Sequence, residues 1–429
     1  MVDLEEIKTY VTIVGRLKED LKKYDKSVIG YIGKHIVGTG EDAHLTTKVF
    51  FDLLRPHVVL ICGKRGSGKS YSAAVILEEI LELEKDYAEK TAVVVFDPVG
   101  IYWSMKLPNE QQMDLLKQWN LKPKGYSNVK VYVPAELREA YENTGIPVDY
   151  SLKISTREFL PDDWVLAFNL EKTSEFAVAL NRNINNLMEE KEVFDIDDII
   201  TKIKDDERAS THVKNVLISY FELAKSWGIL TSEGMSIYDI VRPNTVNVID
   251  LSRVKGEEWG LRNLLAAWIT RQVYRERVIA RKEEEVARLE GSEIKKTFPL
   301  TWLVFEEAHN FIPSDRQTVS SEAIKMIAKQ GREPGIGLIV ITQMPGKIHQ
   351  DILSQTDIVI SFRLTSRDDL QALHAVYQTY MAEELEKLIN LLPRWAGSAI
   401  ILDDNLEKIF TVNIRPRLSH HSGGTAALV

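Results

Sequence analysis

One short segment restricts this chain more than any other feature of its sequence. It reads Gly63, Lys64, Arg65, Gly66, Ser67, Gly68, Lys69 and Ser70, and it fits the GxxxxGK[ST] phosphate-loop pattern. An apolar, β-branched run precedes it at 58–62, and a segment with helical apolar spacing follows at 72–83. A turn between a strand and a helix can surround phosphates with backbone N–H groups, helped by the positive end of the helix. The segment therefore predicts a nucleotide-binding site in an α/β fold.

The residue types of the segment indicate the ligand. Lys69 is expected to reach the β and γ phosphates, and the Ser70 hydroxyl is expected to bind Mg²⁺. Tyr71, which follows directly, is included in the predicted nucleotide-binding set. The predicted cofactors are ATP and Mg²⁺.

Short apolar runs recur along the chain and predict a sheet. They lie at 91–96, 246–251, 302–305, 337–341, 357–362 and 398–402. Helical patterns separate several of them, including a long one at 260–289. Continuous apolar strands alternating with helices are typical of a parallel sheet covered on both faces. We therefore expect a central, mainly parallel sheet flanked by helices.

The middle of the chain has a different pattern. Strand-like runs disappear between 161 and 230, where one helix face gathers Val213, Val216, Leu217, Tyr220, Phe221 and Ala224. This indicates an inserted helical subdomain. The predicted organisation is a short N-terminal region at 1–50, a core at 51–160 and 231–415, the insertion at 161–230, and a C-terminal tail at 416–429.

The apolar run at 302–305 ends in two carboxylates, Glu306 and Glu307. Glu306 can hold the Mg²⁺ shell from the strand tip, and Glu307 can polarise the attacking water. Taken alone, two acids here are also compatible with an ordinary solvated strand end. The phosphate loop in the same chain favours the catalytic interpretation.

Three further polar residues are candidates with open alternatives. Asp97 ends the run at 91–96, where it could support the metal or only open a turn with Pro98. Gln343 follows the run at 337–341 and could contact the γ-phosphate or orient water, or be a turn residue. Arg332 lies in a short loop after a helical segment and could neutralise transferring phosphate in a neighbouring subunit, or be an ordinary surface arginine.

Composition narrows the class of protein. The 429 residues carry a net charge of −9, so any contact with nucleic acid must be local. Cys62 is the only cysteine, which excludes an intramolecular disulfide and suggests a buried side chain. No run approaches the ~18 apolar residues of a membrane span, and the start of the chain does not look like a secretion signal. The expectation is a cytoplasmic protein without a membrane segment.

Several of these motifs together resemble one family. They are the phosphate loop, Phe96-Asp97-Pro98, Glu306-Glu307-Ala308-His309, Gly331-Arg332-Glu333-Pro334-Gly335 and Thr342-Gln343-Met344-Pro345. In this combination they resemble the HerA branch of the FtsK–HerA superfamily of P-loop ATPases, over residues 31–417. Members commonly carry a β-barrel ahead of the ATPase; the short region at 1–50 is expected to be a reduced barrel or an arm.

The resemblance implies a RecA-like fold and a ring, usually a hexamer, that moves along double-stranded DNA by ATP hydrolysis. It implies a partner such as a NurA-type nuclease, in DNA-end processing, repair or defence. It also implies that Glu306 supports the metal, Glu307 activates water, Arg332 acts across the subunit boundary and Gln343 senses the γ-phosphate. The alternative function is an ATPase subunit that remodels or assembles a protein complex without moving on DNA.

Overall fold

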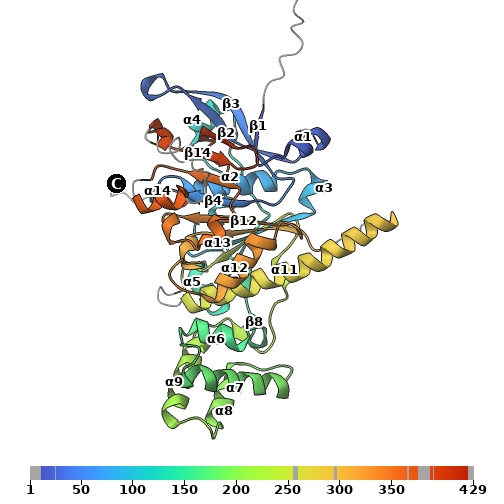
Figure 1. Cartoon of the computed structure of the whole chain (residues 1–429), viewed down its shortest axis with the longest axis vertical. Helices are drawn as coiled ribbons and strands as arrows, with labels where there is room; N and C mark the ends of the chain where they lie inside the picture. The colour runs from blue at the N-terminus through green and yellow to red at the C-terminus, as the bar shows by residue number, and fades with distance from the viewer. Residues whose placement is uncertain are drawn as a thin grey trace, which may run out of the picture.

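The computed structural model of this chain describes residues 11–24, 26–254, 259–293, 297–364, 367–374, 387–389 and 391–423. Within them, a 13-stranded sheet runs through the molecule in the order β1-β3-β2-β15-β14-β13-β4-β12-β11-β5-β10-β6-β7 (Figure 1). Its strands are β1 (Thr12–Val14), β2 (Ile29–Val37), β3 (His44–Asp52), β4 (Val58–Cys62), β5 (Thr91–Asp97), β6 (Val129–Pro134), β7 (Tyr150–Leu152), β10 (Val246–Asp250), β11 (Leu300–Phe305), β12 (Ile336–Thr342), β13 (Ile358–Ser361), β14 (Ser398–Asp403) and β15 (Lys408–Ile414). The strands from β13 to β7 in this order all pair in parallel.

The apolar strands are buried on both faces of the sheet, as their composition predicts. In β4, Leu60 and Cys62 face one core while Val59 and Ile61 face the other. The first core is covered by α11 (Trp259–Glu290) and α12 (Val319–Gln330), and the second by α2 (Lys69–Leu81). Because both faces are covered by helices, the α/β fold with a mainly parallel sheet is confirmed.

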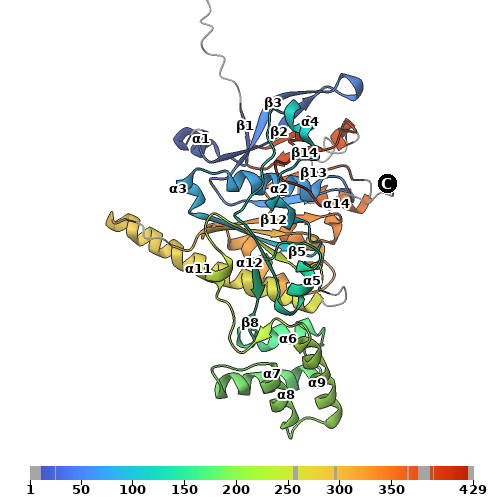
Figure 2. The same ribbon diagram turned by 180° about the vertical axis from the view of Figure 1, so that it is seen from behind.

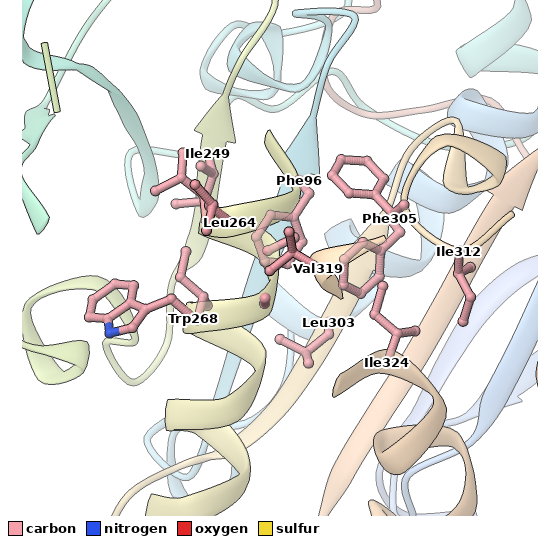
Figure 3. Close-up of a cluster of buried hydrophobic side chains, with 14 of the residues drawn as sticks. Phe96, Ile249, Leu264, Trp268, Leu303, Phe305, Ile312, Val319 and Ile324 are labelled. Atoms are coloured by element: carbon pink, nitrogen blue, oxygen red, sulfur yellow. The ribbon is translucent and has the colours of Figure 1, made fainter. Parts of the chain in front are cut away.

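Figure 3 shows the first core beneath the strands that carry the candidate site. Phe96 of β5 stacks on Phe305 of β11 with ring centroids 4.6 Å apart. Leu264 and Trp268 approach from α11, and Val319 and Ile324 from α12. This packing fixes the ends of β5 and β11 relative to each other.

The N-terminal strands, in the region predicted to be a reduced barrel or an arm, pair with the main sheet. The parallel part of the sheet continues through antiparallel β14 and β15, and β15 then pairs with β2, which pairs with β3. The described part of this region therefore extends the main sheet and does not close into a separate barrel. The physical reason is that the outer edge of β15 offers free hydrogen-bonding groups, which β2 satisfies.

The predicted limits 161–230 enclose four helices, α6 (Pro161–Ala167), α7 (Glu175–Glu190), α8 (Ile196–Lys204) and α9 (Thr211–Lys225). They form a separate layer at the end of the molecule opposite β1–β3 (Figure 1). Side chains of Ser174, Asp195 and Ser210 cap the last three helices at their N-termini. A short pair of strands, β8 (Ile154–Ser155) and β9 (Leu230–Thr231), joins the two ends of this layer.

The C-terminal half of α11 projects beyond the body of the molecule in both views (Figures 1 and 2). The helices not named so far are short. They are α1 (Lys18–Tyr24), α3 (Lys85–Ala88), α4 (Met113–Gln118), α5 (Arg138–Glu142), α10 (Ile237–Ile240), α13 (Gln350–Leu353) and α14 (Arg367–His374). Among the described residues, no helix is both long and apolar enough to cross a membrane.

Candidate active site

The phosphate loop connects β4 to α2 at the carboxyl edge of the parallel sheet. Gly63, Gly66 and Gly68 have φ values of +154°, +73° and +105°, which L side chains rarely adopt. A Cβ atom at Gly63 would lie 2.6 Å from the Cβ atom of Phe362. The hydroxyl of Ser67 is buried without a hydrogen-bond partner among the described residues. These features fit a loop whose backbone surrounds a phosphate chain.

Lys69 begins α2, and its amine donates a hydrogen bond of 2.9 Å to the carbonyl of Lys64. Burial lowers the pKa of Lys69, while the carboxylates of Glu307 and Glu306 act in the opposite direction. The amine therefore lies within the loop and in the field of both acids. Lys64 and Arg65 are exposed at the tip of the loop.

Glu306 lies at the tip of β11 and is 2% exposed. Its two carboxylate oxygens accept hydrogen bonds from the Ser70 hydroxyl, at 2.9 Å, and from the Tyr102 hydroxyl, at 2.7 Å. Burial raises the pKa of Glu306 to about 8, and the hydrogen bonds from Tyr102 and Ser70 oppose this rise. The structure thus brings Ser70 and Glu306 together, as the sequence predicts.

Glu307 follows with a left-handed backbone, φ +50° and ψ +48°, which is uncommon for a residue with a side chain. Burial raises the pKa of its carboxyl, and Lys69 lowers it. Its Oε1 accepts a hydrogen bond of 3.4 Å from the side-chain amide of Gln343. Its Oε2 is buried without a hydrogen-bond partner among the described residues. An unsatisfied carboxylate oxygen in the site suits an acceptor for the proton of a water molecule.

His309 lies beside Glu307, with Nδ1 3.4 Å from the Glu307 Oε2 atom. Burial lowers the pKa of His309 to about 4, so the imidazole is neutral near pH 7 and the contact is not an ion pair. The same nitrogen lies 3.2 Å from the Thr342 hydroxyl. His309 therefore connects the ends of β11 and β12 without adding charge.

The order of the strands explains how these residues meet. β12 lies between β4, which carries the phosphate loop, and β11, which carries the two acids. Gln343 follows the last residue of β12 and is therefore held between them. Parallel strands bring their carboxyl ends to one edge, which is where ligands bind in open α/β sheets.

Asp97 lies at the same edge but is engaged differently. Its carboxylate accepts hydrogen bonds from the backbone N–H groups of Val99, Gly100, Ile101 and Tyr102, at 2.7 to 3.1 Å. Each carboxylate oxygen accepts two of these bonds, so the four acceptor positions of the carboxylate are occupied. Burial and the neighbouring Asp250 raise the pKa of Asp97 to about 7. These contacts match the alternative in which Asp97 organises the turn, and they do not favour the predicted role as a metal ligand.

Arg332 lies at the opposite edge of the sheet, because it precedes β12 whereas Gln343 follows it. Its guanidinium donates to the carbonyl of Gln355 at 2.9 Å and lies 3.5 Å from Asp357. The side chain is 46% exposed. Arg332 is thus separated from the phosphate loop of its own chain by the length of a strand, and its role in a neighbouring subunit stays a prediction.

Two features of the site lie outside the motifs that the sequence offers. Tyr102 lies five positions beyond the strand end, in a segment without a motif. The other feature is the segment 415–423, in which the backbone N–H of Arg417 donates to the Tyr71 hydroxyl at 2.8 Å and the ring of His421 lies edge-on to Tyr71. The described part of the predicted C-terminal tail is thus docked beside the first turn of α2. Residues 424–429 lie outside the described residues.

The donors at this edge suit Mg²⁺, since Ser70 and Glu306 offer oxygen atoms only. Groups of three or more His, Cys, Asp or Glu side chains that could hold a metal by themselves are absent from the described ranges. Ser70 and Glu306 are the residues that could hold the ion beside a bound nucleotide.

Comparison with known proteins identifies the family of the chain. The family described as "Helicase HerA, central domain" matches residues 31–273, which is more than half of the chain. The chain belongs to the HerA helicase family. The resemblance to the HerA branch is therefore confirmed, as is a P-loop ATPase fold.

Two HerA-family relatives show how far the sequence of this chain has diverged from theirs. The "DNA double-strand break repair helicase HerA" of Pyrococcus furiosus is 27% identical over 324 residues, covering 71% of this chain and 56% of the relative. The protein of the same name from Sulfurisphaera tokodaii is 27% identical over 351 residues, covering 79% of this chain and 60% of the relative. The chain thus spans less than two thirds of the length of both relatives.

Solved structures show the same fold at lower identity. VirB4 of Thermoanaerobacter pseudethanolicus has a TM-score of 0.54 and 12% identity, covering 92% of this chain and 98% of that one. The bacterial conjugative coupling protein TrwB has a TM-score of 0.50 and 11% identity, covering 86% of this chain and 87% of that one. These likenesses support the architecture of the HerA-family core.

Proposed function

We propose that this HerA-family chain is an ATP hydrolase that moves along double-stranded DNA as a homo-oligomeric ring. The supporting observation is the meeting of two pairs at one sheet edge: Ser70 with Glu306, and Glu307 with Gln343. The first pair suits a metal bound to nucleotide, and the second suits a water molecule beside the γ-phosphate.

Each residue of the site has a distinct task in this proposal. The phosphate loop and Lys69 bind the triphosphate, while Ser70 and Glu306 offer oxygen ligands to Mg²⁺, which when bound neutralises phosphate charge. Glu307 takes a proton from the attacking water, and Gln343 orients that water or contacts the γ-phosphate. Arg332 would serve the site of a neighbouring subunit, because it lies at the other edge of its own sheet.

Movement on DNA is proposed from the family, and the charge of the chain limits how DNA can be contacted. The two relatives above carry the name of DNA double-strand break repair helicases. A net charge of −9 excludes a broadly basic surface, so a few contacts per subunit would be repeated around a ring. A hexamer in the cytoplasm, acting in DNA-end processing, repair or defence with a NurA-type nuclease or another effector, completes the proposal.

A second candidate is an ATPase that remodels a protein complex without moving on DNA. The acidic net charge favours it, since an acidic surface repels nucleic acid outside local contacts. Both candidates use the same site for ATP hydrolysis. They differ in what stimulates hydrolysis.

The deciding experiment measures ATP hydrolysis by the purified protein with and without linear double-stranded DNA over a salt series. Lys69→Ala serves as the blank, and Lys85→Ala, at an exposed helix position, as the matched control. DNA stimulation that declines with salt supports the motor, because phosphate contacts release counterions. Hydrolysis that DNA does not change would support the remodelling ATPase, and no hydrolysis above the blank would contradict both.

A further inference from the structure

Tyr102 is a buried tyrosine at the centre of the site that none of the roles above uses. It is 1% exposed and starts a short 3-10 helix, Tyr102–Lys106, that follows the turn after β5. Its hydroxyl donates a 2.7 Å hydrogen bond to the Glu306 Oε2 atom. The other oxygen of the same carboxylate accepts from Ser70 at 2.9 Å. One donor on each oxygen fixes the plane of the Glu306 carboxylate.

Backbone hydrogen bonds in turn hold Tyr102 in place. Its N–H donates to Asp97 at 2.9 Å, and the N–H of Ile101 donates to the same carboxylate oxygen at 2.7 Å. The hydroxyl of Ser104 closes the segment by donating to the Ile101 carbonyl at 2.7 Å. The chain of contacts therefore runs from Asp97 through the turn to Tyr102, and from Tyr102 to Glu306.

Glu306 needs such support because of where it lies. It is nearly fully buried, and both Asp97 and Glu307 place further negative charge beside it. A buried carboxylate requires donors to its oxygens, and a ligating carboxylate is oriented by the groups that hydrogen-bond to it. Ser70 is expected to contact the metal as well, so Tyr102 is the donor to Glu306 that has no ligand role of its own.

We propose that Tyr102 is a positioning residue for the Mg²⁺–nucleotide complex, and that Asp97 acts on the site through Tyr102. The hydroxyl holds the Glu306 carboxylate in one orientation at the edge of the sheet, ready to serve the metal. This inference rests on the proposed function and names a residue that regulates the metal affinity of the same site.

The test compares Tyr102→Phe with Tyr132→Phe. Tyr132 is the matched control because it is fully buried on β6 and its hydroxyl donates a single 2.8 Å hydrogen bond, to the Asp239 carbonyl. The thermal unfolding midpoint is measured with a non-hydrolysable ATP analogue while the Mg²⁺ concentration is varied. Binding of the analogue in EDTA is measured as the metal-free reference.

In Tyr102→Phe, the Mg²⁺ concentration giving half of the stabilisation is expected to rise by about tenfold. This is a typical effect of removing a hydrogen-bond donor to a metal ligand. Analogue binding in EDTA should match the wild type, and Tyr132→Phe should leave the Mg²⁺ curve unchanged. A general loss of packing would lower stability at every Mg²⁺ concentration without moving the half-point. A Tyr102→Phe curve that coincides with the wild-type curve overturns the proposal.

Asp97→Asn is the second variant and keeps Tyr102 in the chain. Its side-chain nitrogen cannot accept two of the four backbone N–H groups that Asp97 binds, so the turn that carries Tyr102 shifts and the Mg²⁺ half-point should rise as well. An unchanged half-point in a folded Asp97→Asn protein contradicts the proposal even where Tyr102→Phe does not fold. Failure of the wild type to bind the analogue in a Mg²⁺-dependent way would instead remove the proposed ATPase function.

Discussion

At the scale of single residues, the site depends on carboxyl groups that differ in what surrounds them. Glu306 has a donor on each oxygen, whereas Glu307 keeps one oxygen without a hydrogen-bond partner among the described residues. The first arrangement suits a fixed ligand, and the second suits a base that must receive a proton. The different environments of these neighbouring glutamates therefore fit the separate functions proposed for them.

Glu307→Gln should keep ATP binding and lower the hydrolysis rate by about a hundredfold or more, the usual contribution of a general base. The substitution preserves the size of the side chain and the contact to Gln343 but removes the proton acceptor. Bound nucleotide and phosphate release would be measured in parallel. Glu322→Gln, at an exposed position on α12, is the matched control, and a Glu307→Gln protein that hydrolyses ATP as fast as this control would exclude Glu307 as the base.

The sequence predicted the residues of the site more completely than their contacts. The phosphate loop, Glu306, Glu307 and Gln343 were identified because their types and their places at strand ends carry chemistry. Tyr102 could not be identified, because its role depends on a turn that folds back toward another strand. Asp97 was assigned correctly to the strand end, but four backbone donors, which only the structure reveals, engage its carboxylate.

At the scale of elements, α2 connects the phosphate loop to a buried ionic cluster. Its first residues carry the phosphate loop, and its later turn carries Glu78, a fully buried carboxylate. Glu78 accepts hydrogen bonds from Arg415 at 2.8 Å and from the Ser419 backbone and hydroxyl at 2.9 and 2.6 Å. Arg415 also pairs with Glu79 at 2.6 Å. The segment 415–423 thus secures the helix on which the nucleotide site is built.

Arg415→Met should lower the free energy of unfolding by about 3 kcal/mol, because the buried Glu78 loses its hydrogen-bonded arginine and keeps only Arg417, at 3.7 Å, as a charged neighbour. Chemical denaturation measures this change. Arg138→Met is the control, since the exposed Arg138–Glu142 pair is expected to contribute less than about 1 kcal/mol. Equal effects of the two substitutions would show that the buried pair does not stabilise the fold.

A second buried ionic cluster ties elements together at the opposite edge of the sheet. His57, 3% exposed, lies 2.7 Å from Asp357 and 3.2 Å from Asp52. Burial disfavours the charged imidazole, but these carboxylates outweigh it and raise the pKa of His57 to about 9. Arg16 donates to the same Asp52 at 2.7 Å. The cluster therefore joins the N-terminal strands to the parallel core.

This cluster predicts a loss of stability at alkaline pH. The pKa of His57 in the folded chain is above the ordinary value of 6.5, so its contribution is complete below about pH 6.5 and is lost as the pH rises through about 9. The upper bound is about 3 kcal/mol, from 1.36 kcal/mol per pKa unit. The free energy of unfolding, measured from pH 6 to 10, should fall more steeply for the wild type than for His57→Gln. Parallel curves for the two proteins would contradict this assignment.

At the scale of the whole molecule, the two edges of the parallel sheet carry different sets of candidate residues. The carboxyl edge gathers the residues that suit ATP hydrolysis, and the amino edge carries Arg332. Periodicity predicted the parallel strands and α11 well. Strands buried on both faces of a sheet are nearly continuous apolar runs, which are easy to recognise in a sequence. The pairing of β15 with β2 could not be predicted, because such pairing depends on which edges meet in space.

The position of Arg332 gives a prediction for the assembly. If Arg332 acts on the site of a neighbouring subunit, Arg332→Ala and Lys69→Ala proteins should each lack hydrolysis, whereas their mixture should regain part of it. Mixed rings contain interfaces with an intact Lys69 on one side and an intact Arg332 on the other. Arg316→Ala, at an exposed loop position, is the control and should be active by itself. A mixture that never exceeds the sum of its components would exclude a shared site.

The docking of the segment 415–423 onto α2 also has a consequence for how the protein is made. The partners Glu78 and Arg415 are 337 positions apart. The ribosome therefore completes the phosphate loop long before it supplies the arginine that neutralises the buried acid of the same helix. Contacts between such distant positions form late and slow the search for the native state. A nascent chain should thus acquire a nucleotide-competent helix only after Arg415 has been synthesised, and a chain stalled on the ribosome before Arg415 should be digested by protease without protection by ATP.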